Sequence, residues 1–474
     1  MNIRFGTSGW RGIIADDFTF QNVKIATAAI GEHIIAKGGK SIVVGYDTRF
    51  MAEDFARVAS QVLAAYGIKV YLSSSDIPTP VIAHAILRKS ADGGINFTAS
   101  HNDYYYHGMK FSNKSGGPAL PEETTDIEKR IEEMIKRNMP IKEIKFEESK
   151  KRGLIETFYD NKYYKDIMKL VDFTPLTDKK ISVVYDALFG TGRLYLPRML
   201  DSFTNLLLIN GDRDPLFGNI HPEPIEENLK VLIKYVRRFH ADIGLATDGD
   251  ADRFGIVDKG GRYISPNKIL AIIYYYFLNE RGMKGNVVRS VATTSMLDRI
   301  AHHFGYKCIE TPVGFKYIGD EIVKGNAIFG GEESGGATMQ GWLPEKDGIL
   351  IDLLVTEIVA KKRKRLSSLF RDLTSKFGEV YSERIDYTYE TDVEKTKKKL
   401  RENALNISKT EPVNSIQELD GIKIMFSNGE WLLFRFSGTE KKIRAYCESG
   451  SSATLNRLKS LANTVVNASI EGNY

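Results

Sequence analysis

The sequence predicts an α/β protein with three related α/β domains, whose sheets are mixed but largely parallel, and a C-terminal α+β domain. Short apolar, β-branched runs alternate with helical segments three times along the chain, which indicates parallel βαβ units. The composition changes near residue 376, where a lysine-rich helix precedes a predicted hairpin. The 474 residues are enough for about three domains of roughly 150 residues each.

The first unit contains three predicted strands and one polar loop. A buried strand lies in 41–49, a helix follows over 52–66, and a second strand covers 68–72. The third strand, 94–97, leads directly into the loop TASHND at 98–103. Because function in such sheets tends to lie beyond the carboxyl ends of strands, this loop is a candidate functional segment.

The second and third units repeat this order. In the second unit we expect a strand and turn within 181–192, a strand at 206–209 and a strand that runs into the aspartates within 241–253. In the third unit we expect strands at 286–290, 306–310 and 327–329 and a helix at 297–304. In each unit the last strand runs into a polar loop, DGDADR (248–253) or GGEESGG (330–336). The repeat has no short fixed period, which favours three related domains over a solenoid.

We expect domain boundaries at charged or compositionally distinct stretches. The predicted domains span residues 1–150, 151–255, 256–375 and 376–474. The charged stretch 142–151 closes the first domain, and five basic residues at 361–365 are interpreted as a solvated helix face near a domain end. Strands at 422–426 and 431–436, which bracket an Asn-Gly turn, form a predicted hairpin in the fourth domain.

The charge balance and the cysteine content argue against several classes of protein. The net charge of +5 arises from 66 basic and 61 acidic residues, a balance too even to indicate nucleic-acid or membrane binding. Cys308 and Cys447 are too far apart in the sequence for a disulfide framework or a zinc pattern, so we expect the protein to be located in the reducing cytoplasm. The N-terminus lacks the apolar core of a signal peptide. The longest apolar run, 269–278, is shorter than the ~20 residues that span a bilayer and predicts a buried helix.

The DGDADR loop is a candidate metal site. Asp248, Asp250 and Asp252 stand at alternate positions and can converge on one hard cation through oxygen ligands. A calcium loop of the EF-hand type would need Gly and Glu where Arg253 and Lys259 stand. The alternative is a solvated acidic turn, but crowded carboxylates are costly unless a cation offsets them. Three ligands would also leave a coordination position open for catalysis.

Ser100 in TASHND is a candidate carrier of a phosphoryl group. Its surroundings lack the G-x-S-x-G pattern of hydrolases, so an acyl-transfer triad is unsupported, and the alternative is a structural serine. Lys110 in GMKF (108–111) is a candidate for proton transfer or charge stabilisation. A serine that can carry a phosphoryl group and a hard-metal site that can neutralise it make phosphoryl transfer the leading hypothesis.

Three further segments suit a phosphosugar. In GGEESGG, glycines allow close backbone approach, and the carboxylates and hydroxyl suit sugar hydroxyls. In RFSGTEKKIRAY (435–446), small residues, hydroxyls and guanidinium groups form a combination that binds phosphate. In GTSGWRG (6–12), Arg11 stands among small residues and could point at a phosphoryl group. A flexible acidic turn and an ordinary hairpin turn are the alternatives for the first two segments.

Five segments, GTSGWRG, TASHND, DGDADR, GGEESGG and RFSGTEKKIRAY, stand in the order found in the α-D-phosphohexomutase superfamily. The chain resembles this superfamily over essentially its whole length. The family patterns are G-T-S-G-x-R-G, T-x-S-H-N, D-G-D-x-D-R, G-E-x-S-G and S-G-T-E. Five ordered matches are far more specific than one. The resemblance implies three related α/β domains and a smaller fourth domain around a central cleft, in agreement with the repeat pattern.

The resemblance also implies roles in catalysis. Ser100 is similar to the serine that is phosphorylated in the active enzyme, and Mg²⁺ is implied between the three aspartates and a phosphoserine oxygen. Arg11, Lys110 and Arg253 are implied to stabilise the transferring phosphoryl group. Either Lys110 or His101 is implied to assist proton transfer.

The same resemblance implies contacts with the substrate. The contacts implied for the sugar, including those from the further sugar-phosphate loop TPVGFKY, are Thr311, Gly314, Lys316, Glu332 and Ser334. The clamp implied for the non-reacting phosphate consists of Arg435, Ser437, Gly438, Thr439 and Arg444.

Two departures from the family pattern bear on the substrate. Asp103 stands where the family often has Pro, and the GEESGG loop is closer to phosphoglucomutases than to the GEMSGH or GEQSGH forms. We therefore expect interconversion of α-D-glucose 1-phosphate and glucose 6-phosphate, with Mg²⁺ as cofactor and glucose 1,6-bisphosphate as intermediate and activator.

A phosphomannomutase or an enzyme for both sugars is the alternative. A non-catalytic sugar-phosphate or cation-binding protein and a metal-dependent phosphatase are alternatives of other classes. We expect a monomer or homodimer.

Overall fold

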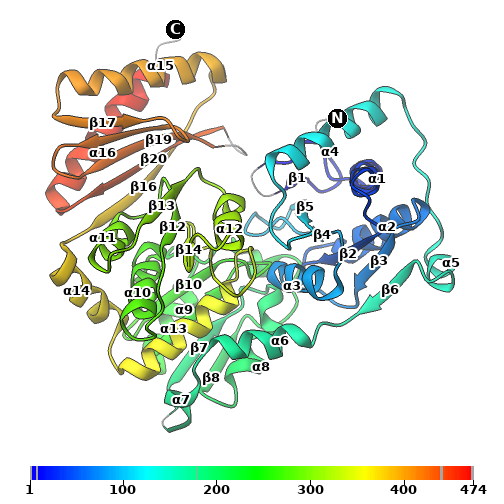
Figure 1. The fold of residues 1–474 in the computed structure, drawn as a ribbon, viewed down its shortest axis with the longest axis horizontal. Helices are drawn as coiled ribbons and strands as arrows, with labels where there is room; N and C mark the ends of the chain where they lie inside the picture. Colours follow the sequence, from blue (N-terminus) through cyan, green and yellow to red (C-terminus); the bar gives the residue numbers. More distant parts are fainter. Residues whose placement is uncertain (1–2, 7–8, 179, 438–440, 471–474) are drawn as a thin grey trace.

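The structure is a computed structural model that describes residues 3–6, 9–178, 180–437 and 441–470. Four β-sheets follow one another along the chain, and each sheet with its helices forms one unit. In Figure 1 the chain runs from the blue and cyan first unit through the green second unit and the green-to-yellow third unit to the orange and red fourth unit. None of the described helices is long and apolar enough to cross a membrane.

The strands of the first three units form three separate sheets. The first unit contains β1 (Trp10–Ile13), β2 (Ser41–Tyr46), β3 (Lys69–Ser73), β4 (Gly93–Phe97), β5 (Tyr106–Asn113) and β6 (Ile155–Phe158). The second contains β7 (Ser182–Asp186), β8 (Asn205–Ile209), β9 (Ile243–Thr247), β10 (Phe254–Asp258) and β11 (Arg262–Ile264). The third contains β12 (Val287–Ser290), β13 (Cys308–Thr311), β14 (Phe329–Gly331) and β15 (Ala337–Met339).

Each of these sheets contains the same four-strand frame. A central strand has one parallel neighbour on each side, and an antiparallel strand follows on the outer side of one neighbour. The frame is β5-β4-β2-β3 in the first unit, β10-β9-β7-β8 in the second and β15-β14-β12-β13 in the third. The prediction of three related α/β domains with mixed, largely parallel sheets is confirmed. The antiparallel strands were not predicted, because β5 carries polar residues such as His107 and β15 has only three residues.

One strand crosses a predicted domain boundary. β6 pairs with β3 in parallel, from Val70 opposite Ile155 to Ser73 opposite Phe158. The first sheet therefore continues beyond the predicted boundary at residue 150. We propose that the first domain extends through β6; the other boundaries stay predictions.

Helices connect the strands and cover the sheets. Those of the first unit are α1 (Phe20–Ala36), α2 (Ala52–Ala65), α3 (Thr79–Lys89), α4 (Pro121–Lys136) and α5 (Phe146–Lys151). The second unit contains α6 (Lys162–Ile167), α7 (Thr174–Asp178), α8 (Leu196–Leu200) and α9 (Lys230–Arg238). The third contains α10 (Pro266–Asn279), α11 (Met296–His303), α12 (Phe315–Val323), α13 (Gly348–Lys362) and α14 (Leu366–Phe377). The basic run at 361–365 spans the junction of α13 and α14, where Arg363 is left-handed (φ 52°), so it does not form one helix face.

The first three units share a hydrophobic core. One cluster of buried side chains joins residues of α3, β7, α10 and α13, and α13 is buried along nearly its whole length. The predicted apolar helix at 269–278 corresponds to α10, whose side chains are mostly buried in this cluster. Separate clusters of buried side chains also lie within the first, second and third units, and β4 and β5, which flank the Ser100 loop, pack in that of the first unit. The shared cluster therefore joins the three units to one another but is not the whole core of each sheet.

The fourth unit is an antiparallel sheet with two helices. It contains β16 (Tyr381–Thr388), β17 (Val413–Gln417), β18 (Ile422–Phe426), β19 (Trp431–Phe436), β20 (Lys442–Ser449), α15 (Val393–Asn406) and α16 (Ser452–Ile470), with strand order β16-β20-β19-β18-β17. The predicted hairpin corresponds to β18 and β19, and Gly429 in its turn has φ 85°. This unit has its own core, in which Ile424 and Leu432 pack against Leu458. The prediction of a C-terminal α+β domain is confirmed.

A buried ion pair joins the first and second units and offers a test of the fold. Arg193 donates hydrogen bonds of 2.5 and 2.9 Å to the two carboxylate oxygens of Asp76, and the side chains are 8% and 5% exposed. We expect Arg193→Ala to lower the free energy of unfolding by about 3–5 kcal/mol, because it leaves a buried carboxylate unpaired. Urea or thermal unfolding measures the change. The control is Arg152→Ala, which breaks an exposed pair with Glu148 and should cost about 0.5 kcal/mol or less. Equal losses in both variants would contradict this account.

Candidate active site

The three polar loops occupy the same place in their units. Each lies between the third parallel strand and the antiparallel strand: Ser100 between β4 and β5, the three aspartates between β9 and β10, and Glu332 between β14 and β15. Beside them is a cavity of about 420 Å³ with walls from all four units. Its basic lining residues are Arg11, Arg253, Lys346, Arg384, Arg435, Lys442 and Arg444. The lining also includes the carboxylates of Asp103, Glu223, Glu332, Glu333 and Asp386, so the basic residues are in modest excess, and this excess suits an anionic ligand.

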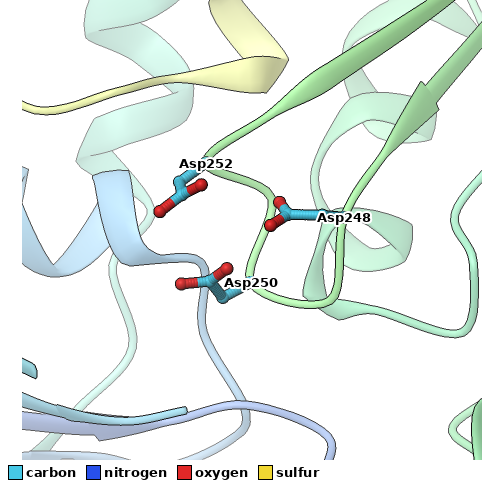
Figure 2. Close-up of side chains that lie close together, drawn as sticks. All are labelled: Asp248, Asp250 and Asp252. Atoms are coloured by element: carbon cyan, nitrogen blue, oxygen red, sulfur yellow. The ribbon is translucent and has the colours of Figure 1, made fainter. Parts of the chain in front are cut away.

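The aspartates of the second unit form a compact acidic cluster. Asp248, Asp250 and Asp252 are 0% exposed, and one carboxylate oxygen from each lies within 4.8 Å of the others. Figure 2 shows the three carboxylates converging from one loop between two strands. The left-handed backbone at Ala251 (φ 56°) turns the loop between the second and third aspartates.

Two ammonium groups from other units offset part of this charge. Lys110 Nζ of the first unit lies 2.6 Å from Asp250 Oδ2 and 2.7 Å from Asp252 Oδ2. Lys346 Nζ of the third unit lies 2.9 Å from Asp252 Oδ2. Burial raises the pKa of Asp252, but attraction to the two ammonium groups outweighs burial and leaves this pKa below its ordinary value. Burial and the neighbouring carboxylates raise the pKa of Asp248 well above its ordinary value.

The oxygens that remain fit a hard cation. Asp250 Oδ1 and Asp252 Oδ1 are buried without a hydrogen-bond partner in the described part of the chain. Buried polar atoms in proteins are nearly always paired, so two orphaned carboxylate oxygens in one cluster indicate a missing partner. A cation such as Mg²⁺ prefers carboxylate oxygens and accepts additional oxygen ligands from water or phosphate. The geometry therefore fits Mg²⁺ among the three aspartates.

Ser100 contacts this cluster across the interface of the first two units. Its Oγ donates a hydrogen bond of 2.7 Å to Asp248 Oδ2, and its backbone is left-handed (φ 51°). The close approach depends on Gly249, because a Cβ there would lie 2.7 Å from the Ser100 carbonyl oxygen. A phosphoryl group on Ser100 would therefore lie beside the predicted metal ligands.

A buried arginine that was not among the predicted site residues holds the serine loop. Arg49, in the turn after β2, is fully buried and donates hydrogen bonds to the carbonyl oxygens of Ser100 and Tyr106 at 2.8 and 2.9 Å. Asp47 accepts a hydrogen bond of 2.5 Å from Thr98, whose own Oγ1 accepts one of 2.8 Å from the Ser100 N–H. The sequence feature that could have identified Arg49 is the presence of an aspartate and an arginine directly after a predicted buried strand.

The predicted residues Arg11, His101 and Arg253 line the cavity beside Ser100. Arg11 donates a hydrogen bond to the side chain of Asn102, and burial with repulsion from Arg253 lowers its pKa to about 10. Arg11 is therefore still charged at neutral pH. Burial and the two nearby guanidinium groups lower the pKa of His101 well below its ordinary value, so this imidazole is neutral. Its Nδ1 lies 3.4 Å from Ser100 Oγ.

Glu332 and Gly314 bring the two loops of the third unit together. Glu332 Oε1 accepts a hydrogen bond of 2.9 Å from the Gly314 N–H, and both residues line the cavity with Ser334. Burial and the adjacent Glu333 raise the pKa of Glu332 above its ordinary value. The arrangement presents a carboxylate and a hydroxyl to the cavity, which suits a ligand with several hydroxyl groups.

Two predicted sugar contacts lie outside the cavity lining. Thr311 is buried, and its Oγ1 donates to the carbonyl oxygen of Arg289 at 3.3 Å. Lys316 Nζ lies 5.4 Å from the ring centroid of Tyr317. Phe315 lines the cavity instead of Lys316, because α12 begins at this point and successive side chains leave a helix in different directions.

The fourth unit contributes the predicted residues Arg435, Ser437 and Arg444 to the cavity. Gly438 and Thr439 lie outside the described residues. Arg435 Nε lies 2.8 Å from Asp420 Oδ2, which also accepts a hydrogen bond from the backbone of the third unit. The lining residues that were not predicted include the charged residues Glu223, Lys346, Arg384 and Lys442.

Comparison with known protein families gives the same division of the chain. Residues 2–138, 161–261 and 265–377 match phosphoglucomutase/phosphomannomutase alpha/beta/alpha domains I, II and III, and residues 391–462 match the C-terminal domain of that family. The four matches occur in chain order, one for each unit of the structure.

Individual relatives align over nearly the full length. A probable phosphoglucosamine mutase of Methanosphaera stadtmanae is 33% identical, with 98% of each chain covered. A phosphoglucomutase of Komagataeibacter xylinus is 30% identical, with 95% of this chain and 88% of the relative covered. The crystal structure of a putative phosphomannomutase from Thermus thermophilus superposes with a TM-score of 0.83 at 32% identity and covers 98% and 99% of the two chains. The chain therefore belongs to the phosphoglucomutase/phosphomannomutase family of α-D-phosphohexomutases, which are intramolecular phosphotransferases.

Proposed function

We propose that the chain interconverts α-D-glucose 1-phosphate and glucose 6-phosphate through a phosphorylated Ser100 and glucose 1,6-bisphosphate. The observation that carries this proposal is the 2.7 Å hydrogen bond from Ser100 Oγ to Asp248, beside a cationic cavity with walls from all four units. A nucleophilic oxygen, an acidic cluster that fits a hard cation and a cavity for a phosphosugar are the parts that phosphoryl transfer requires.

The reaction needs two transfers of opposite direction. In the first, the bond from phosphorus to Ser100 Oγ breaks, a bond to the free sugar hydroxyl oxygen forms, and the hydroxyl proton ends on Oγ. The bisphosphorylated sugar then reorients, and the second transfer returns its other phosphoryl group to Ser100. The enzyme thus ends each cycle phosphorylated, as it began.

The charges around Ser100 support specific roles. Arg11 and Arg253 line the cavity next to Ser100 and are placed to stabilise charge on the transferring phosphoryl group. Lys110 is bound by two carboxylates, which favours charge stabilisation over proton transfer for this residue. The imidazole of His101 lies 3.4 Å from Ser100 Oγ, and we propose it for proton transfer because of this position, although its lowered pKa makes it a weak base.

We propose Mg²⁺ as the cofactor, held by Asp248, Asp250, Asp252 and an oxygen of phosphorylated Ser100. When bound, the cation would supply positive charge that stabilises the transferring phosphoryl group. Arg435, Ser437 and Arg444 of the fourth unit are placed to bind the phosphate that does not react. This clamp must hold each phosphate in turn, so it suits a separate unit at the cavity wall.

The sugar preference is inferred from the GEESGG loop. Glu332 and Ser334 line the cavity, and their loop sequence favours glucose phosphates. The relatives named above include a probable phosphoglucosamine mutase and a phosphoglucomutase. Mannose phosphates, or both glucose and mannose phosphates, are the alternative from the sequence, and the first relative adds glucosamine phosphates. A cytoplasmic location and a monomeric or homodimeric state stay predictions.

We expect Ser100→Ala to lower mutase turnover by at least about 10³-fold, because the phosphoryl carrier is lost. Intact mass after incubation with glucose 1,6-bisphosphate should show one added phosphate on the wild type and none on the variant. Ser408→Ala, at an exposed serine of the fourth unit, serves as the control. Near-wild-type mutase activity in Ser100→Ala would refute the mechanism. Sugar-phosphate binding without phosphorylation or turnover would favour a non-catalytic binding protein, and net release of inorganic phosphate would favour a phosphatase.

The metal site can be tested without measuring turnover. We expect Asp250→Asn to weaken Mn²⁺ binding, followed by electron paramagnetic resonance, by about 10–100-fold or more, because a charged ligand is lost. Asp372→Asn, at a carboxylate that is 60% exposed, should bind Mn²⁺ as the wild type does. Equal affinities in both variants would exclude the cluster as the cation site.

Substrate preference is tested by comparing kcat/KM for glucose 1-phosphate, mannose 1-phosphate and glucosamine 1-phosphate. We expect glucose 1-phosphate to be preferred by about 10-fold or more, a difference that one or two hydrogen bonds to a sugar can supply. A higher kcat/KM for either of the other sugars would assign the chain to that sugar instead.

A further inference from the structure

We propose that Arg49 and Asp47 are positioning residues that keep the Ser100 loop in register with the metal-binding cluster during phosphoryl transfer. The inference rests on the proposed function, because it concerns the phosphorylated state of Ser100. Neither residue lines the cavity, so both would act through the loop rather than on the substrate.

The contacts of Arg49 are concentrated on one loop. Its Nη1 and Nη2 donate to four carbonyl oxygens, those of Ser100, Asn102, Asp103 and Tyr106, at distances between 2.5 and 2.9 Å. A guanidinium group offers five N–H donors in a rigid plane, so one side chain can bind several carbonyl groups at once. Arg49 therefore ties both ends of the serine loop to a single buried point.

Asp47 connects this point to both backbone groups of Ser100. Its Oδ2 lies 3.2 Å from Arg49 Nε and accepts the 2.5 Å hydrogen bond from Thr98 Oγ1. Thr98 accepts a hydrogen bond from the Ser100 N–H, while Arg49 binds the Ser100 carbonyl oxygen. The left-handed backbone of Ser100 is uncommon for a residue with a side chain, and it persists only where surrounding contacts determine it. These contacts supply that determination.

The second unit shows that the fold itself does not require the arginine. Asp47 Oδ1 accepts a hydrogen bond of 2.9 Å from the N–H of Arg49, and Asp186 Oδ1 accepts one of the same length from Leu188. Both aspartates stand at the end of the central strand of the same frame. The aspartate-to-backbone hydrogen bond is thus kept in the second unit, but a buried leucine with a left-handed backbone (φ 44°) stands where the first unit has the arginine. The arginine occurs in the unit that carries the serine.

Phosphorylation of Ser100 would favour displacement of the Ser100 loop. A phosphoryl group adds nearly two negative charges beside the carboxylate of Asp248, 2.7 Å from the serine oxygen. Repulsion between the phosphoryl group and the carboxylates would move the loop away from the acidic cluster unless the surrounding cations and the contacts of Arg49 and Asp47 hold it in place. A displaced phosphoserine meets water instead of the sugar hydroxyl. In that case the bond from phosphorus to Oγ breaks, a water oxygen bonds to phosphorus, and a proton from water ends on Oγ, releasing inorganic phosphate.

The test compares two fates of the same phosphoryl group. Enzyme phosphorylated at Ser100 is mixed with hexose monophosphate, and the ratio of phosphoryl transfer to phosphate release is measured, together with kcat and KM. We expect Arg49→Met to lower kcat by about 10²-fold with little change in KM, and to lower the ratio by about 10-fold or more. Arg49→Lys should fall between Arg49→Met and the wild type. Thr98→Val, which removes the acceptor for the Ser100 N–H, should lower the ratio in the same direction and covers the case that Arg49→Met does not fold.

The control separates positioning from folding. Arg193→Met removes another buried arginine between the first two units and should lower thermal stability but leave the ratio unchanged, because a smaller folded fraction reduces both rates equally. A ratio within twofold of wild type in folded Arg49→Met or Thr98→Val would overturn the inference while the proposed function stands. A wild-type enzyme that transfers no phosphoryl group to hexose monophosphate would overturn both.

Discussion

Mutual repulsion among the buried carboxylates of Asp248, Asp250 and Asp252 is the constraint on which the arrangement of the site depends. Such a cluster is stable only beside positive charge, and two other units of the described chain supply part of that charge. Lys110 comes from the first unit and Lys346 from the third, while the aspartates belong to the second. Offsetting part of the negative charge of the three carboxylates thus requires the packing of three domains.

The first three units are joined to one another by a larger buried cluster than the one that joins the fourth unit to the third. A shared hydrophobic cluster joins the first three units, which also have buried clusters of their own, so close-packed side chains hold Ser100 near Asp248. The fourth unit has its own core and contacts the third through a smaller cluster around Trp431 and through polar groups such as Lys423. The reacting groups are therefore placed by the larger rigid block, and the fourth unit adds its cationic wall to the same cavity.

Local sequence patterns predicted the repeated units and the polar loops, since period and composition determine both. The hairpin strands Ile422–Phe426 and Trp431–Phe436 lie where they were expected, because turn chemistry at Asn428-Gly429 is a local signal. The role of Lys346 could not be predicted in this way, because its partner Asp252 is distant in sequence and belongs to another unit. Lys316 shows another limit: the loop pattern alone does not tell which of its side chains faces the cavity, and Phe315 lines it while Lys316 Nζ lies 5.4 Å from the ring centroid of Tyr317.

The shared frame of the first three sheets has a consequence for how such a protein can arise. In each frame the polar loop is bounded by two neighbouring antiparallel strands, which hold both of its ends. A loop anchored in this way can change its sequence without disturbing the sheet that carries it. Duplication of one ancestral unit would then provide three equivalent positions that diverge independently, one into the Ser100 loop, one into the acidic cluster and one into the GEESGG loop. Three loops with different functional residues in one chain are thus compatible with descent of the three units from one ancestral unit.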